Sequence, residues 1–124
     1  MHKHYRKFLI SLSYALNGIR LALCYEPHMR VHVFFAILAL ICGSIFRINE
    51  AEWLYLLMTI TLVLFAELMN TALEANVDLT TKKQKPEAKV AKDAAAGAVL
   101  ITSINSLICG LIIFGPKFLK ILGL

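Results

Sequence analysis

The sequence predicts an all-α integral membrane protein, in which an N-terminal amphipathic surface helix precedes three transmembrane helices. The chain has 124 residues, of which 59% are hydrophobic, and its mean hydropathy is +0.70. A small soluble domain cannot bury that much apolar surface, whereas bilayer lipid covers it. Three long apolar runs follow one amphipathic segment. Because this length fits a single domain, we expect one membrane-embedded domain over residues 1–124.

The surface helix is predicted over about residues 5–25, because apolar and polar side chains separate on a helical projection of this segment. The apolar arc consists of Phe8, Leu12, Ala15, Leu16, Ile19, Ala22 and Leu23, and the opposite face carries mainly Ser11, Tyr14, Asn17 and Gly18. Basic residues lead into the segment, which favours a helix lying in the membrane interface. A core-facing helix of a soluble protein shows the same pattern, but the apolar runs downstream favour the interface.

Three membrane spans are predicted, at about residues 31–47, 52–80 and 87–114. Pro27 interrupts the chain before the first span, because the residue preceding a proline is biased away from the helical region. Trp53 begins the second span as an interfacial anchor. The second span runs for about 28 residues, or ~42 Å. One of its ends is therefore expected to project beyond the hydrocarbon core, which is ~30 Å thick.

The third span is expected to begin at Pro86, because proline suits the first position of a helix, and to end at Gly115-Pro116. If the N-terminus is cytoplasmic, 10 of the 13 Lys and Arg residues lie inside and 3 lie outside. The excess of positive charge inside predicts this orientation, with the C-terminus outside the bacterial plasma membrane. The net charge of +5 then favours an anionic membrane surface or substrate as partner, and not nucleic acid.

One stripe of the second span carries four polar side chains, Glu67, Asn70, Glu74 and Asp78. A solvated helix face beyond the membrane would account for Asp78, but Glu67 directly follows an apolar run. A carboxylate at that depth needs a cation, a proton or a metal ion. Carboxylate oxygens suit Mg²⁺, and Glu26 is a further carboxylate expected at the same cytoplasmic face. Two carboxylates from different helices, together with phosphate oxygens, would complete a magnesium site.

The third span opens with Lys92 and Asp93, followed by small residues over 94–98 that let helices approach closely. Lys92 is expected to pair with Glu74 or to hold an anionic phosphate. His32, at the start of the first span, is assigned an interfacial or substrate-facing role. The remaining polar or thiol side chains are interpreted as structural or solvated. They are Ser103 and Asn105 as interhelical hydrogen-bonding groups, Cys24, Cys42 and Cys109 as free thiols, and His2 and His4 as tail residues.

Two motifs resemble those of the small prokaryotic diacylglycerol kinase family. They are ELMNTALEANVDL over 67–79 and AKDAAAGAVL over 91–100, separated by a basic loop. The resemblance extends over most of the chain, and the Arg30-Val31-His32 segment is most similar to undecaprenol kinases of the Gram-positive type. It implies ATP-dependent phosphorylation of a membrane lipid alcohol, undecaprenol in the first place and diacylglycerol as the alternative. It also implies a homotrimer with active sites between protomers.

The resemblance implies a role for each matching residue. Glu67 would be the general base for the lipid hydroxyl, with Asn70 and Arg30 as further substrate contacts. Glu26 and Glu74 would bind Mg²⁺ and, through it, ATP. The direct nucleotide contacts would be Lys7, Tyr14, Lys92 and Asp93.

The chain departs from the family pattern in the basic loop. Lys83-Gln84-Lys85 stands where relatives often carry an acidic residue and a Tyr-His pair, so those nucleotide contacts are not transferred, although the lysines could attract ATP by charge. Two other classes of function are compatible with parts of the pattern. A small cation-coupled transporter would use Glu67 as its carrier site, and a non-catalytic assembly subunit would use the carboxylates only for stability.

Overall fold

The structure, a computed structural model, describes residues 2–83 and 85–123, with side chains from residue 5 onward. These residues form four helices and no strand: α1 (His2–Tyr25), α2 (Pro27–Ile45), α3 (Glu50–Thr80) and α4 (Pro86–Ile121). All four are long and apolar enough to cross a membrane. The prediction of an all-α integral membrane protein is confirmed. Because α1 also meets this criterion over Tyr5–Tyr25, its placement at the membrane surface stays a prediction.

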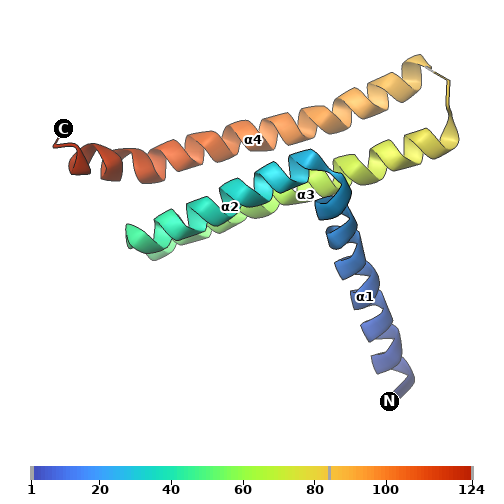
Figure 1. Ribbon diagram of the computed structural model, residues 1–124, viewed down its shortest axis with the longest axis horizontal. Coiled ribbons are helices and arrows are strands. Elements are labelled where there is room, and N and C mark those ends of the chain that lie inside the picture. The colour runs from blue at the N-terminus through green and yellow to red at the C-terminus, as the bar shows by residue number, and fades with distance from the viewer. Residues whose placement is uncertain (1, 84, 124) are drawn as a thin grey trace.

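The break between α1 and α2 lies where the sequence predicts it. Glu26 is extended, with φ −99° and ψ 111°, and Pro27 occupies the first turn of α2. Ala22 and Met29, on either side of the break, are 4% and 2% exposed. Beyond this point α1 extends away from the other three helices (Figure 1). Its apolar side chains are largely exposed, which suits contact with lipid or with another protein chain.

The turn between α2 and α3 is held by local hydrogen bonds and by close packing. Asn49 caps α3 by accepting from the Glu52 N–H, and the Glu52 side chain accepts from the Asn49 N–H, at 2.9 Å each. This reciprocal arrangement satisfies backbone donors that a helix start otherwise leaves free. Gly43 of α2 faces the Trp53 ring so closely that a Cβ there would lie 2.9 Å from the ring. A small hydrophobic cluster around Ile48 completes this end of the molecule.

The pair of α3 and α4 forms the longest part of the structure. With 31 residues, α3 is about 46 Å long, which exceeds a hydrocarbon core of ~30 Å. The two helices lie alongside one another and continue past the start of α2 as a hairpin (Figure 1). Pro86 begins α4, as expected from its position. The hairpin end therefore has the length to project out of a membrane, as the sequence predicts.

The predicted end of the last helix at Gly115-Pro116 is wrong, because α4 continues through Pro116 to Ile121. Proline removes one backbone hydrogen bond from a helix interior, and contacts with other helices compensate for that loss here. Phe118 packs against Phe46, with ring centroids 4.9 Å apart. Lys117 Nζ donates to the backbone oxygen of Ile113 at 3.0 Å and to Glu52 Oε1 at 2.5 Å. These contacts hold the last helical turn in place.

Candidate active site

Glu67 is the buried carboxylate at the centre of the candidate site. It lies on α3 beside the buried apolar residues Val63 and Ala66, and it is 3% exposed. His32 of α2 faces it, with its Nε2 3.9 Å from Glu67 Oε2. Within the described part of the chain, His32 is the one basic side chain in ion-pair range of this carboxylate. The Glu67 side chain is therefore buried and not solvated, as its position directly after an apolar run predicts.

Asn70 and Glu74 are joined one turn further along α3. Asn70 Nδ2 donates to Glu74 Oε1 at 3.1 Å. Asn70 Oδ1 is buried and accepts no hydrogen bond from the described residues. Buried polar atoms without a partner are uncommon in folded proteins and often mark a place where a ligand or water binds. The bond to Glu74 thus fixes the Asn70 amide so that one acceptor remains available.

Lys92 pairs with Asp78 and not with Glu74, which corrects one of the two alternatives stated for it. Lys92 Nζ donates to Asp78 Oδ1 at 2.6 Å, joining α4 to the end of α3. Asp78 therefore has a partner, where the sequence suggested only a solvated helix end. Asp93, the next residue, forms an ion pair with Lys89 one turn earlier on α4. Both predicted nucleotide contacts on α4 are thus engaged with a neighbour of opposite charge.

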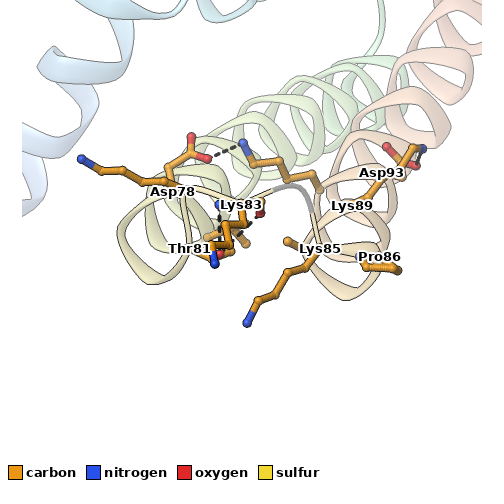
Figure 2. Close-up of a pocket in the computed structure, with 11 residues that line it drawn as sticks. Asp78, Thr81, Lys83, Lys85, Pro86, Lys89 and Asp93 are labelled. Atoms are coloured by element: carbon orange, nitrogen blue, oxygen red, sulfur yellow. Dashed lines mark hydrogen bonds and ion pairs between the residues drawn. The ribbon is translucent and has the colours of Figure 1, made fainter.

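The hairpin end encloses a pocket of about 920 Å³ between the end of α3, the loop and the start of α4 (Figure 2). Its charged lining consists of Asp78, Lys82, Lys83, Lys85, Lys89, Lys92 and Asp93. The ion pairs of Lys92 and Lys89 neutralise the two aspartates, which leaves the charges of the three loop lysines unpaired among the described residues. Gln84, of the Lys83-Gln84-Lys85 segment singled out in the sequence, lies outside the described residues. The pocket is therefore electropositive, as a phosphate-bearing ligand requires.

Four other predicted site residues form no ion pair with these groups among the described residues. Lys7 and Tyr14 are exposed on α1, which extends away from the other helices (Figure 1). Arg30 is exposed on α2, and Glu26 is half-buried at the break between α1 and α2. The single chain thus brings together Glu67, Asn70 and Glu74 on α3, but it leaves α1 and its predicted nucleotide contacts apart.

The predicted metal ligands Glu26 and Glu74 are two carboxylates from different parts of the chain. Among the described residues, neither forms an ion pair with Lys, Arg or His. In the same part of the chain no three His, Cys, Asp or Glu side chains gather around one point. A metal here would have few protein ligands, which suits Mg²⁺, since it commonly binds one or two carboxylates together with phosphates and waters. The donor chemistry fits.

Sequence reasoning missed the pairing of His32 with Glu67. The signal was present in the spacing of α2, because Met29, His32 and Ala36 recur at intervals of three and four residues and so share a helix face. That face packs on α3. The apolar character of the first span concealed the pattern, since nearly every position around His32 is hydrophobic.

Comparisons with known proteins support one family. Residues 13–114 match the family model described as prokaryotic diacylglycerol kinase. The undecaprenol kinase of Bacillus subtilis (strain 168) is 41% identical over 111 residues, which cover 90% of each chain. A diacylglycerol kinase of Synechocystis is 36% identical over 115 residues, covering 92% of this chain and 66% of that protein. A diacylglycerol kinase of Helicobacter pylori is 31% identical over 99 residues, covering 80% of this chain and 77% of the relative.

Proposed function

Since this chain belongs to the prokaryotic diacylglycerol kinase family and is a lipid kinase, we propose that it transfers the γ-phosphate of ATP to undecaprenol, forming undecaprenyl phosphate. The Bacillus subtilis relative named undecaprenol kinase is 41% identical, against 36% for the Synechocystis diacylglycerol kinase. The alternative within the family is phosphorylation of diacylglycerol to phosphatidic acid. Both lipids present a hydroxyl group at the membrane surface while their tails remain in the bilayer.

The observation that carries this proposal is the buried Glu67 on a membrane helix, next to the unpartnered Oδ1 of Asn70. Phosphoryl transfer needs a group that orients the acceptor and takes its proton. In the proposed step, the lipid hydroxyl donates its proton to Glu67, and its oxygen bonds to the γ-phosphorus. The bond from that phosphorus to the β,γ-bridging oxygen breaks, and ADP leaves. Asn70, whose amide Nδ2 is held by the bond to Glu74, is the proposed group that positions the lipid hydroxyl or Glu67 for this transfer.

Glu74 and Glu26 are the proposed ligands of Mg²⁺. When bound, the metal neutralises charge on the phosphate oxygens of ATP. Glu74 also accepts a hydrogen bond from the Asn70 amide. This one hydrogen bond therefore connects the proposed metal ligand to the residue proposed to position the acceptor. The bond supports the proposal that the lipid hydroxyl and the ATP phosphates bind next to one another along the same face of α3.

The electropositive pocket at the hairpin supports nucleotide binding at the cytoplasmic end of the protein. Lys92 and Asp93 line it, and the three loop lysines add attraction for the polyphosphate. Lys7 and Tyr14 lie apart on α1 (Figure 1), so α1 of a neighbouring chain is the proposed source of these two contacts. This supports active sites between protomers, and we propose the homotrimer itself from membership of the family. We further propose that α1 lies in the membrane interface, with the N-terminus inside and the C-terminus outside.

The deciding assay measures initial rates of phosphate transfer from ATP, in the presence of Mg²⁺, to undecaprenol and to diacylglycerol in the same bilayer nanodiscs. The proposal expects the higher kcat/KM with undecaprenol. A higher value with diacylglycerol supports the alternative. Folded protein that phosphorylates neither lipid contradicts both.

A further inference from the structure

We propose that His32 is a positioning residue for the base Glu67, a role that rests on the proposed function. In this role the Nε2–H group of His32 donates to the Glu67 carboxylate and directs it toward the lipid hydroxyl. The two groups come from different helices and are 3.9 Å apart. Hydrogen bonds of this kind are often long in a free enzyme and shorten when the substrate is bound.

Burial of the carboxylate is the first argument. Glu67 is 3% exposed, and an ionised carboxylate at that depth is unfavourable unless a donor or a cation faces it. His32 is 20% exposed and meets this need within the described chain. A neighbour of Glu67 on its own helix does not, because the Thr71 hydroxyl donates to the backbone oxygen of Glu67 and not to its carboxylate.

The packing of α2 on α3 is the second argument, because it fixes the distance between the two groups. The inward face of α2 carries Met29, then His32, and then small residues at Ala36, Ala39 and Gly43. Small residues let two helices lie close together. Gly43 contacts the Trp53 ring, and Met29 is 2% exposed, so α2 is anchored on both sides of His32. The histidine therefore has little freedom to move away from Glu67.

The space around His32 is the third argument. His32 lines a crevice of about 80 Å³ between α2, α3 and α4, whose other walls are mostly apolar. Ser106 supplies the one other polar side chain in this lining. A histidine that turned away from the carboxylate would find few other hydrogen-bond partners in this apolar crevice. The geometry thus favours the pair over a substrate-facing or solvent-facing histidine.

The test is a double-mutant cycle between His32→Ala and Glu67→Gln, measured as kcat and KM with undecaprenol in nanodiscs. His32→Ala is expected to lower kcat by ~10- to 100-fold, a part of the 10²–10⁴-fold that a general base supplies, with KM values within ~3-fold. In the Glu67→Gln background, the same change is expected to lower kcat by less than ~3-fold, because His32 acts through Glu67. His28→Ala is the matched control, since His28 is exposed on the same helix.

Each result has a distinct meaning. An unchanged kcat for His32→Ala overturns the inference, and so does an equal loss of kcat in the wild-type and Glu67→Gln backgrounds, which indicates a packing role. A near-normal rate for Glu67→Gln alone overturns the proposed base and the inference with it. If His32→Ala does not fold, the cycle is run with His32→Gln, which keeps an N–H donor of similar reach. A smaller loss of kcat that again vanishes in the Glu67→Gln background then supports the role.

Discussion

Replacement of Gly43 by alanine tests the packing that sets the distance between α2 and α3. The added Cβ would lie 2.9 Å from Trp53 Cη2, 3.1 Å from Ile48 Cδ1 and 3.2 Å from Trp53 Cζ2. The Ile48 methyl group can rotate aside, but the indole ring cannot, because it packs in the cluster around Ile48 and Leu56. Overpacking of this kind costs about 1–3 kcal/mol. Alanine regains ~1 kcal/mol of helix propensity, so we expect a net destabilisation of roughly 0–2 kcal/mol.

Gly110→Ala is the matched control for this change. Gly110 also lies inside a helix and lines the crevice between helices, yet a Cβ there would meet nothing within 4 Å. The propensity gain is common to both variants, so the difference between their unfolding free energies isolates the overpacking cost of about 1–3 kcal/mol. Trp53 is the one tryptophan of the chain, so its fluorescence reports unfolding at the contact itself.

The measurement is unfolding in mixed micelles as the mole fraction of SDS rises. Gly110→Ala should keep its kcat, since a Cβ at that position meets nothing within 4 Å. Equal stability of Gly43→Ala and Gly110→Ala, within ~0.5 kcal/mol, would refute the close contact between α2 and Trp53. Of the two contacts argued to anchor α2 on either side of His32, the one at Gly43 would then be excluded, and the burial of Met29 alone would remain.

Three further predictions concern the site. Glu67→Gln should keep its oligomeric state in size-exclusion chromatography and lose ~10²- to 10⁴-fold in kcat; a near-normal rate would exclude it as the base. Lys92→Gln should raise the KM for ATP by ~10-fold or more, whereas Asp78→Asn should change it by less than ~3-fold, because the lysine charge remains; equal effects would contradict nucleotide binding by Lys92. Co-expression of Tyr14→Ala with Glu67→Gln should restore up to about one quarter of wild-type activity, because random assembly places two intact contributions in that share of shared sites; no recovery would argue against sites between protomers.

The helices could be predicted because their signals are local. Apolar runs, Pro27 and Pro86 act within a few residues, and α2, α3 and α4 begin close to the predicted positions. The stripe from Glu67 to Asp78 also follows from helical periodicity alone. Pro116 failed as a stop signal because contacts from distant parts of the chain override it. Phe46 and Glu52, which hold the turn around Pro116, are more than 60 residues away in sequence.

The pairings between helices could not be predicted, since they depend on how one helix is displaced along another. A shift of one turn between α3 and α4 decides whether Lys92 meets Asp78 or Glu74, and the loop that sets this shift has no periodicity to interpret. The contact of His32 with Glu67 depends in the same way on the small residues that let α2 approach α3. Residue types therefore predicted which groups carry the chemistry, and packing determined which of them meet.

The extended backbone of Glu26 sets the direction in which α1 leaves the other helices. Tyr14 lies 12 residues before it, about 18 Å along the helix, so a rotation of ~10° at Glu26 moves Tyr14 by ~3 Å. That displacement is the difference between a hydrogen bond and no contact. The positions of the proposed nucleotide contacts on α1 therefore depend on the backbone of Glu26. The side chain of that same residue is a proposed ligand of the metal ion.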